Sequence, residues 1–405
     1  MTSTGRLIRD VQLIDGTGAA PVPGQSVVIE GSKLSWIGPT ESAPAFTPER
    51  VIDGRGRTLL PGLINAHVHL CNDGAPDLFA QVMADSIPLA TLRAARNARL
   101  TLESGVTTVR DCGAADNIVI ELGRAIADGF IEGPRVRAAG RVITMTGGHG
   151  HFMGREADGP DAIRQATRAE IKEGADFIKV MATGGVLTPG VDPANTALQL
   201  DELRVVADAA HNSGRRVTTH AIGNAGIKNA LHAGIDSIEH GFYLDDEALE
   251  LAVSQGTFLV PTLVAIACIL DHGVDAGVPA WVVAKAAEHA EANRASFKAA
   301  VDSGMKIAAG TDAGTPFNRH YDMAREMAMM VRFGLTPMQA ITAATRNSAE
   351  NLDVLHSVGT IEVGKLADLL LVDGDPSVDI EAMSRVVLVT KDGTVYRDDT
   401  AAEKN

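Results

Sequence analysis

The chain has 405 residues, of which 45% are hydrophobic and 21% charged, so we expect a globular protein with a large core. Its 36 lysines and arginines against 51 aspartates and glutamates give a net charge of −15. This balance disfavours nucleic acid or an anionic membrane as the main partner, because phosphate contacts need clustered cations. The scarcity of cysteine, a start unlike a secretory leader and the lack of long apolar runs favour a cytoplasmic enzyme that acts on a small molecule.

Both ends of the chain are rich in short β-like runs. Residues 1–57 contain LIRDVQLIDG and QSVVIEGSKLSWIG, separated by Asp-Gly, Gly-Ser and Gly-Pro turns. Residues 358–405 repeat this pattern in LADLLLVDGDP and VVLVTKDGTVYRD. Because an isolated hairpin is marginal in water, we expect the two ends to pair into one small β-sandwich domain.

Residues 58–357 show a different pattern, in which short apolar runs alternate with helical stretches rich in Ala, Leu, Glu and Arg. The runs lie at 59–70, 105–113, 135–143, 175–185, 215–223, 236–241, 257–264 and 305–314. Strand and helix in alternation predict a parallel sheet, and eight such units predict an α/β fold closed as a (β/α)8 TIM barrel. A doubly wound sheet would need a glycine-rich phosphate-binding turn, which we do not find.

The ends of these runs carry side chains that bind metals or act as bases. The strand ends of such a barrel meet at one mouth, so we expect these side chains to form one site. A single histidine at a strand end is more often structural, but chance does not readily place six suitable residues at corresponding ends. His67 and His69 lie on the same face of a strand, because side chains alternate with period two. The set is His67, His69, Lys179, His220, His240 and Asp312.

The ligand types indicate which ions the site would hold. Imidazoles and carboxylates favour zinc, although iron, manganese, nickel or cobalt could use the same atoms. Lys179 lies in the apolar run FIKVMA, where an ammonium group is poorly solvated and the neutral, nucleophilic amine is favoured. Such an amine can add carbon dioxide to form a carbamate that bridges two divalent metal ions. The alternatives are a lysine that reaches the rim or forms an internal ion pair.

Five motifs resemble those of the amidohydrolase superfamily: PGLINAHVHL, FIKVMATGG, TTHA, SIEHG and AAGTDAG. The segment VGTIEVGKLADLLLVDGDP is similar to the return of that family into its small β-domain, so the resemblance covers essentially the whole chain. It implies the binuclear branch with a carboxylated lysine. By this resemblance His67, His69 and Asp312 hold one metal ion, His220 and His240 hold the other, and carboxylated Lys179 bridges them together with a hydroxide.

Within the superfamily, the resemblance favours hydrolysis over deamination. Deaminases carry a Glu three residues after the histidine of strand five, whereas His220 is followed by Ala221, Ile222 and Gly223. TGGHGHF, FIKVMATGGV and EHGFYLDDE resemble the prolidase-like and imidazolonepropionase-like members. The resemblance therefore implies cleavage of an amide bond in dipeptides, Xaa-Pro or related, or in N-acyl amino acids.

The expected mechanism assigns further residues. The bridging hydroxide would attack the carbonyl, and Asp312 would pass the proton to the leaving nitrogen. Tyr243 is a candidate catalytic donor to the oxyanion, or else an aromatic lid over the mouth. His149 and His151 follow the third run in GGHGHF. We expect at least one of them to bind a substrate carboxylate, with His149 as the catalytic candidate; the alternatives are exposed loop histidines or an adventitious metal site.

Two loops complete the predicted site. Loop eight, TPFNRHYDMARE, offers Arg319 and His320 to an anionic substrate group, although surface solvation would also explain Arg319. Residues 263–279 are apolar and are expected to line a pocket for an apolar side chain. Cys71 and Cys112 have no paired base, so we interpret them as small buried residues.

Competing functions come from other classes. A binding protein built on an inactive barrel is disfavoured, because none of the six metal-ligand positions is missing. The same centre could hydrolyse lactones, carbamates or organophosphate esters, which the fold alone does not separate. The resemblance also implies a homo-oligomer.

Overall fold

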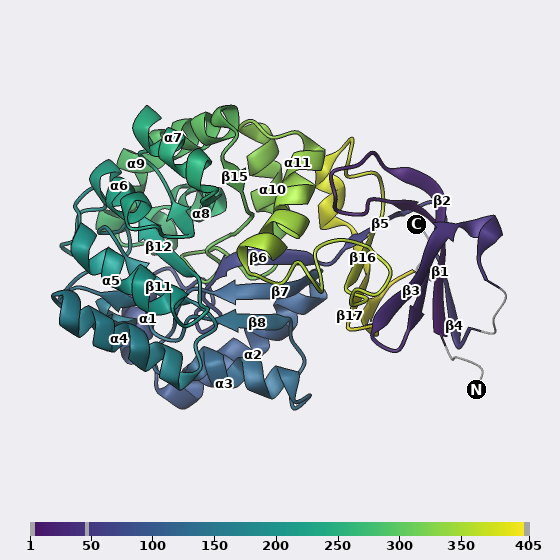
Figure 1. Cartoon of the computed structure of the whole chain (residues 1–405), viewed down its shortest axis with the longest axis horizontal. Helices are drawn as coiled ribbons and strands as arrows, with labels where there is room; N and C mark the ends of the chain where they lie inside the picture. Colours follow the sequence, from purple (N-terminus) through teal and green to yellow (C-terminus); the bar gives the residue numbers. More distant parts are fainter. Residues whose placement is uncertain (1–4, 45–47, 401–405) are drawn as a thin grey trace.

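The computed structural model describes residues 5–44 and 48–400 of the chain (Figure 1). A larger part combines parallel strands with a cover of helices, and a smaller, β-rich part is built from both ends of the chain. The N-terminal strands and the C-terminal strands lie together at one end of the molecule, at the right of Figure 1. Strands from both ends of the chain are therefore paired in one sheet.

The larger part contains two parallel sheets. One sheet has the order β6-β7-β8, with β6 at Leu63–Val68, β7 at Val106–Asp111 and β8 at Arg135–Ala138. The other has the order β10-β9-β11-β12-β13-β14-β15. Its strands are Ile143–Thr144 (β9), Arg155–Glu156 (β10), Ile178–Met181 (β11), Val217–Ala221 (β12), Ser237–His240 (β13), Phe258–Val260 (β14) and Lys306–Ile307 (β15). Each of the eight predicted apolar runs contains a strand.

Backbone hydrogen bonds connect the two sheets at both edges. The amide of Asp312 donates to the carbonyl of His67 over 2.8 Å, next to β6, and the amide of Asp176 donates to the carbonyl of Ala138 over 2.8 Å, next to β8. The ladders of the described strands do not form one closed ring, so the predicted barrel is confirmed only as a parallel α/β fold. Strand β15 is short, and beyond it Gly310 passes so close to β6 that a Cβ atom there would lie 2.9 Å from the backbone nitrogen of His67.

Twelve α-helices lie among the described residues, most of them over the outer face of the sheets. They are Leu78–Ala84 (α1), Ile87–Glu103 (α2), Ile118–Ala127 (α3), Pro160–Glu173 (α4), Leu200–His211 (α5), Asn224–His232 (α6), Asp246–Gln255 (α7), Leu263–His272 (α8), Ala280–Ser303 (α9), Met323–Arg332 (α10), Pro337–Thr342 (α11) and Ser348–Asn351 (α12). Local signals set their ends: α4 begins at Pro160 and ends at Glu173, just before Gly174, whose φ of +106° suits glycine. None of the described helices has both the length and the apolar content needed to cross a bilayer.

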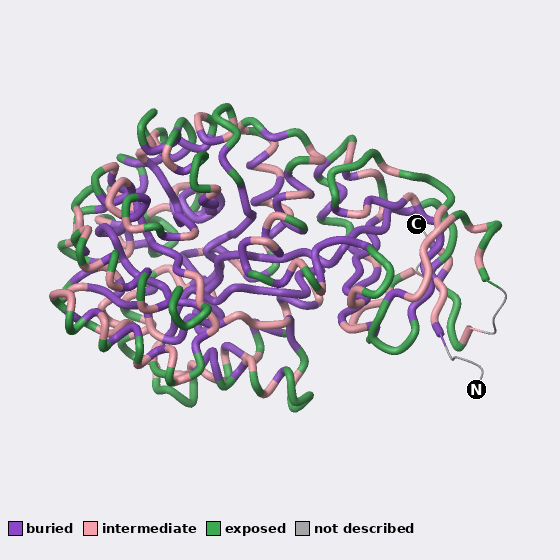
Figure 2. The backbone as a smooth tube through the Cα atoms, viewed as in Figure 1, coloured by how far each residue is buried: buried purple, intermediate pink, exposed green. Residues whose placement is uncertain are grey.

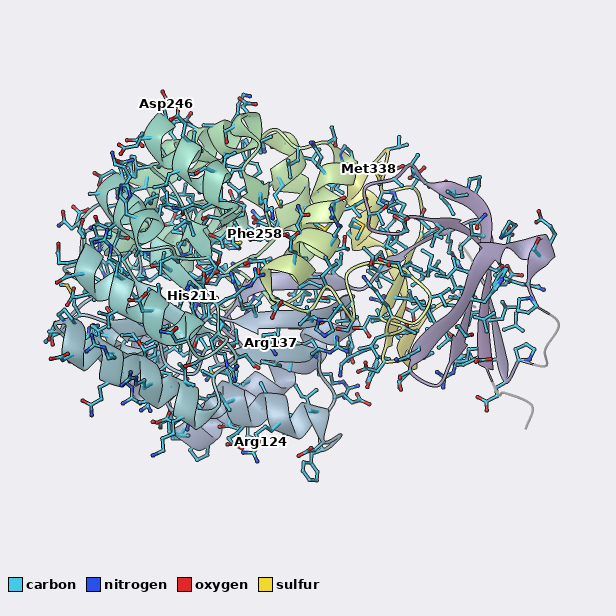
Figure 3. The ribbon with its side chains drawn as sticks, in the orientation of Figure 1. Arg124, Arg137, His211, Asp246, Phe258 and Met338 are labelled. Carbon is cyan, nitrogen blue, oxygen red and sulfur yellow. The ribbon has the colours of Figure 1, made fainter. Side chains whose placement is uncertain are left out.

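The core lies between the strands and the inner faces of the helices. Figure 2 shows the buried strand backbone surrounded by helices whose outer turns are exposed. Val180, Ile238 and Leu259 contribute apolar side chains from β11, β13 and β14. Charged residues such as Arg124 on α3 and Asp246 on α7 lie on the outside (Figure 3). This division supports the strands as a rigid platform for the residues at their ends.

The β-rich part is one sheet of eight strands, with the order β18-β17-β16-β5-β1-β2-β3 and β4 paired to β1. The strands are Gly5–Leu13 (β1), Val22–Glu30 (β2), Lys33–Pro39 (β3), Arg50–Asp53 (β4), Thr58–Pro61 (β5), Leu369–Val372 (β16), Val386–Lys391 (β17) and Thr394–Asp398 (β18). The antiparallel pair of β5 and β16 joins the two ends, with Leu60 opposite Leu370. The pairing does not confirm two facing sheets, and it places β5, just after residue 57, with the terminal strands.

Candidate metal centre

A cavity of about 730 Å³, including the part open to solvent, lies where β6, β11, β12 and β13 end. Its lining includes all six residues that the sequence predicts as metal ligands: His67, His69, Lys179, His220, His240 and Asp312. All six are buried or nearly so. The parallel strands thus bring together side chains from both ends of the helix-covered part, as the pattern of strand ends predicts.

The imidazoles and the carboxylate lie close to one another. Oδ1 of Asp312 is 3.4 Å from Nε2 of His67 and 3.4 Å from Nε2 of His69. The rings of His220 and His240 have centroids 4.6 Å apart. Ligand atoms of His67, His240 and Asp312 lie within 4.8 Å of one another, close enough to share an ion.

Each of the four imidazoles uses one ring nitrogen in a hydrogen bond to another residue of the chain. Nδ1 of His69 donates to the Gly113 carbonyl over 2.8 Å, and Nε2 of His220 donates to the Gly184 carbonyl over 2.7 Å. The other two contacts join Nδ1 of His67 to Oε2 of Glu239 at 2.6 Å and Nδ1 of His240 to Oγ1 of Thr262 at 2.7 Å. Such bonds leave the second ring nitrogen available and fix the ring direction, as for metal-binding histidines.

The cavity keeps three of these imidazoles neutral. Burial lowers the pKa of His67, His220 and His240 well below the ordinary value of 6.5, and nearby positive charges lower each pKa further. Burial also lowers the pKa of His69. The hydrogen bond and charge of Asp312, together with the charge of Asp111, outweigh this effect, so the pKa of His69 is raised. Neutral imidazole is the form that binds a metal ion.

The surroundings of Lys179 show whether these residues fit a pair of metal ions. Its side chain is 1% exposed, and Nζ has no hydrogen-bond partner among the described residues. Neither alternative interpretation, a lysine at the rim or an internal ion pair, matches this position. A buried amine without a partner is costly, whereas a carbamate formed on it would present two oxygens to cations held by the surrounding imidazoles. The donor set therefore fits two divalent ions bridged by a carboxylated lysine.

Backbone strain gathers at the same cavity. His240, Thr262 and Asp312 have φ angles of +73°, +49° and +59°, in the left-handed region that side chains other than glycine rarely adopt. All three line the cavity. Strained residues persist where the surrounding structure holds them, and they cluster at functional sites.

The rest of the wall is mainly apolar. Ala265, Ile266 and Ile269 of α8 line it, in agreement with the pocket expected from the apolar residues 263–279. The other apolar members are Leu78, Phe152, Met153, Met181, Val186, Leu187, Ile222 and Phe242. Among the described lining residues, only Lys179 and Asp312 carry a side chain that is charged in its ordinary state at neutral pH. A substrate with an apolar side chain is complementary to this wall.

Of the two histidines in GGHGHF, only His149 lines the cavity. Its ring lies 4.3 Å from that of His220, and its Nδ1 is 2.8 Å from Oγ1 of Thr188. Burial lowers the pKa of His149 to about 3, so the ring is neutral. Gly185 allows this close approach, because a Cβ atom there would lie 2.5 Å from the His149 ring. His151 lies outside the lining, with its ring centroid 5.8 Å from that of Phe152.

The other predicted substrate contacts also lie outside the lining. The Tyr243 hydroxyl is 2.8 Å from Nδ1 of His289, and an Arg319 nitrogen donates to the Asp73 carbonyl over 2.5 Å. His320 is buried and donates from Nε2 to the Asn72 carbonyl over 2.7 Å, and Asn72 itself lines the cavity. Roles for Tyr243, Arg319 and His320 in substrate binding therefore stay predictions.

Comparison with known proteins identifies the family. The pattern of the Amidohydrolase family matches residues 58–397. The chain belongs to the amidohydrolase family. This confirms the resemblance seen in the sequence, and it makes the protein a hydrolase of carbon–nitrogen bonds.

Similar amidohydrolases have known structures or activities. The ochratoxinase of Aspergillus niger is 30% identical to this chain over 424 aligned residues, which cover 95% of this chain and 85% of that one. The crystal structure of a Xaa-Pro dipeptidase with methionine bound in its active site is 36% identical, has a TM-score of 0.90 and covers 97% of this chain and 100% of that one. A prolidase complexed with N-methylphosphonate-L-proline is 31% identical, with a TM-score of 0.90 and coverage of 97% and 99%.

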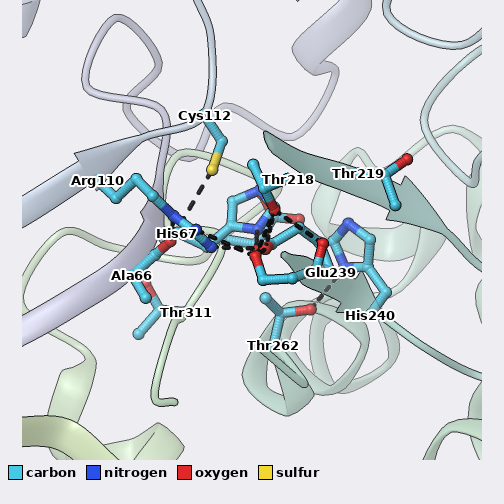
Figure 4. Close-up of polar contacts among 12 residues, drawn as sticks. Ala66, His67, Arg110, Cys112, Thr218, Thr219, Glu239, His240, Thr262 and Thr311 are labelled. Atoms are coloured by element: carbon cyan, nitrogen blue, oxygen red, sulfur yellow. Dashed lines mark hydrogen bonds and ion pairs between the residues drawn. The ribbon is translucent and has the colours of Figure 1, made fainter. Parts of the chain in front are cut away.

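A buried network lies behind His67 in this amidohydrolase, and no motif in the sequence predicts it (Figure 4). Glu239 contacts His67 through Oε2, and its Oε1 accepts hydrogen bonds from Arg110 over 2.5 Å and from Ser237 over 2.8 Å. Cys112 lies near enough to complete a second possible metal group with His67 and Glu239. Burial raises the pKa of Cys112 to about 12, however, so the thiol stays protonated, and Arg110 already neutralises Glu239. The only signal in the sequence was a Glu in the apolar run SIEHG.

Proposed function

We propose that this amidohydrolase is a metal-dependent enzyme that cleaves the amide bond of dipeptides, of the Xaa-Pro type or related, or of N-acyl amino acids. The observation that carries the proposal is one cavity in which buried imidazoles, Asp312 and the unpartnered Lys179 face an apolar wall. Similarity to a Xaa-Pro dipeptidase, a prolidase and an ochratoxinase supports this class of substrate.

The proposed centre holds two divalent ions, with zinc the expected metal for nitrogen and oxygen ligands. His67, His69 and Asp312 are assigned to one ion, His220 and His240 to the other, and carboxylated Lys179 to both. Ions held in this way supply Lewis acidity and a nucleophilic water at neutral pH. The neutral state of the buried imidazoles and the free ring nitrogens support the assignment.

Asp312 is the proposed proton carrier. Its carboxylate lines the cavity beside His67 and His69, which supports its assignment to the proton transfer between the attacking water and the departing group. It accepts a proton from the water and donates that proton to the amide nitrogen. The transfer matters because an amide nitrogen leaves as a neutral amine only after protonation.

The apolar wall and His149 are proposed to hold the substrate. Ile266 and Ile269 from α8, with Val186 and Leu187 from the loop after β11, pack against a proline ring or another apolar side chain. With Nδ1 of His149 engaged by the Thr188 hydroxyl, Nε2 is the ring nitrogen proposed to donate to a substrate oxygen. As a neutral donor, His149 suits a carbonyl as well as a carboxylate.

We propose that the two parallel sheets act as one (β/α)8 barrel over residues 58–357, supported by the backbone bonds of Asp312 and Asp176 across the sheet edges. Residues 1–57 and 358–405 would form the accompanying β-domain, although β5 joins that sheet from residue 58 onward. The homo-oligomer implied by the resemblance is tested by light scattering of the purified protein.

A substrate panel tests the proposed activity. The metal-replete enzyme is assayed against Xaa-Pro dipeptides, other dipeptides and N-acyl amino acids, and in parallel against lactones, carbamates and phosphate esters. We expect hydrolysis of at least one amide substrate with kcat/KM of about 10⁴ M⁻¹s⁻¹ or more. Turnover confined to lactones, carbamates or esters would replace the proposal with the alternative function.

Asp312→Asn is the variant that tests the proton carrier. The amide keeps the size of the side chain and one ligand oxygen, so most of the metal is expected to remain. Turnover is expected to fall about 10²–10⁴-fold, the range for loss of a positioned acid or base. Normal turnover in Asp312→Asn would contradict the assignment, whereas loss of all metal would show that Asp312 acts mainly as a ligand.

A further inference from the structure

The residue behind His67 differs from those behind the other cavity imidazoles. His69 donates to the Gly113 carbonyl, His220 to the Gly184 carbonyl, and His240 contacts the Thr262 hydroxyl, all of which are uncharged groups. Among these four rings, only His67 has a carboxylate on the ring nitrogen that points away from Asp312, at 2.6 Å from Nδ1 to Oε2 of Glu239. A carboxylate behind an imidazole makes the opposite ring nitrogen a stronger electron donor.

Glu239 is itself held from several directions (Figure 4). Its side chain is fully buried, and its Oε1 accepts hydrogen bonds from Arg110 and from the hydroxyls of Ser237 and Thr218. With Oε1 engaged in this way, Oε2 is left for His67. The carboxylate therefore has little freedom to turn away from the ring.

Arg110 connects the same network to the strand that carries His67. Its Nε donates over 2.7 Å to the carbonyl of Ala66, the residue that precedes His67 in β6. Its guanidinium thus contacts both the backbone before His67 and the carboxylate behind the ring. Because Arg110 is 4% exposed, its charge balances Glu239 without solvent screening.

From this arrangement we infer that Glu239 is a positioning residue for the metal centre. It keeps the proton of His67 on Nδ1, points Nε2 into the cavity and makes His67 the strongest imidazole donor of the four. The two metal positions are then unequal, and the one that includes His67 retains its ion at the lower free-metal concentration. This inference rests on the proposed function, because it concerns the same ions.

Chelator titration with elemental analysis measures the effect. The wild-type protein and Glu239→Gln are equilibrated with buffers of decreasing free zinc, and the ions bound per chain are counted. We expect two separate steps for the wild type. In Glu239→Gln the tighter step is expected to weaken about 10–100-fold, the usual effect of losing such a partner, while the weaker step stays in place.

Glu170→Gln is the matched control. Glu170 is also fully buried and paired with an arginine, with 2.6 Å between Oε1 and Nε of Arg155, but it does not line the cavity. Its loss should leave both zinc steps unchanged. Glu239→Gln leaves the Arg110 charge without its partner and risks misfolding, so the double variant Arg110→Gln with Glu239→Gln, which buries no net charge, is measured beside it.

Nitrogen NMR of ¹⁵N-histidine-labelled protein gives a readout that a merely structural role would not change. The resonances of His67, identified by their absence in His67→Gln, are expected to show a protonated Nδ1 in the wild type, with or without zinc. They should show a shifted or mixed tautomer in both Glu239 variants. An unchanged His67 tautomer together with unchanged zinc steps would overturn the inference.

Different results would contradict the proposed function and the inference about Glu239. A wild-type protein that binds no ion after zinc supplementation would overturn the metal centre and the inequality of its two positions, while the NMR arm still decides whether Glu239 sets the His67 tautomer. A wild type with two ions whose affinities do not depend on Glu239 would leave the metal centre standing and refute the inference alone.

Discussion

Nε2 of His220 lies 2.7 Å from the carbonyl oxygen of Gly184, so the loop after β11 determines how this ring is turned. The same loop contains Thr188, whose hydroxyl contacts His149, and it also contributes Val186 and Leu187 to the cavity wall. Lys285 on α9 holds the loop in place: its Nζ donates to the carbonyls of Gly185, Thr188 and Val191. A cation outside the cavity thus supports two of its imidazoles.

Replacing Lys285 with methionine should make the loop after β11 less rigid without changing any residue that lines the cavity. Loss of these hydrogen bonds is expected to lower the free energy of unfolding by about 1–3 kcal/mol and to raise KM roughly 10-fold, with a smaller change in kcat. Steady-state kinetics and urea unfolding measure both effects. Lys298→Met on the same helix is the control, since Lys298 is exposed and pairs with Asp302. An unaltered KM in Lys285→Met would show that the loop holds its shape without the lysine.

Lys179→Ala should remove metal and activity together. The side chain is buried in the cavity lining and has no protein partner among the described residues, so its loss removes the proposed bridge while disturbing few other contacts. We expect activity to fall about 100-fold or more and bound metal to fall with it. Added formate or acetate should restore part of both by replacing the carbamate. A Lys179→Ala protein with normal metal content and full activity would refute the bridging role.

Ile266→Thr should change substrate preference rather than catalysis. Ile266 lines the cavity from α8, and threonine replaces part of its apolar surface with a hydroxyl. For substrates with a large apolar side chain, kcat/KM is expected to fall by about 1–2 kcal/mol, roughly 5–30-fold, and to change little for glycine analogues. Leu270→Thr, on the same helix but outside the lining, is the control. Equal losses for both classes of substrate would show that Ile266 does not contact the side chain.

His320 should make the metal-free protein less stable in acid. Burial lowers the pKa of His320 from 6.5 to about 4. Between pH 6.5 and 4 the unfolded chain therefore binds a proton at His320 and the folded chain does not. The free energy of unfolding is unaffected by this proton above pH 6.5 and decreases as the pH falls toward 4. Over that pH range, the free energy of unfolding of His320→Gln is expected to fall by about 3 kcal/mol less than that of the wild type. Urea unfolding with chelator present measures it, with exposed His232→Gln as control; parallel curves for wild type and His320→Gln would contradict the assignment.

Much of the site could be predicted because its signals are local. His67 and His69 alternate along one strand, and Lys179, His220, His240 and Asp312 each follow or lie in an apolar run, so parallel pairing alone brings them to one place. The apolar residues 263–279 likewise indicated the wall, although they form a helix there rather than a loop. Local patterning also predicted a strand in each of the eight apolar runs, although not the short β10 at Arg155–Glu156, and the ladders of the described residues stop short of a closed ring.

The residues beyond the strand ends could not be placed in the same way. Tyr243 follows β13 closely, yet its hydroxyl turns to His289 on α9, a contact that depends on the packing of a helix 46 positions away. The role of Glu239 could not be predicted, because its partners, His67 and Arg110, lie 172 and 129 positions earlier in the sequence. Periodicity shows which face a strand buries, but it does not show which side chain from another strand packs against that face.

The metal content of the protein tests the central claim most directly. Elemental analysis is performed on a zinc-supplemented preparation that has been assayed on the dipeptide and N-acyl amino acid panel. The account predicts about two zinc ions per chain, together with hydrolysis of an amide substrate that a chelator abolishes. A preparation that holds no metal after supplementation, or that hydrolyses amides equally well without it, would contradict the account.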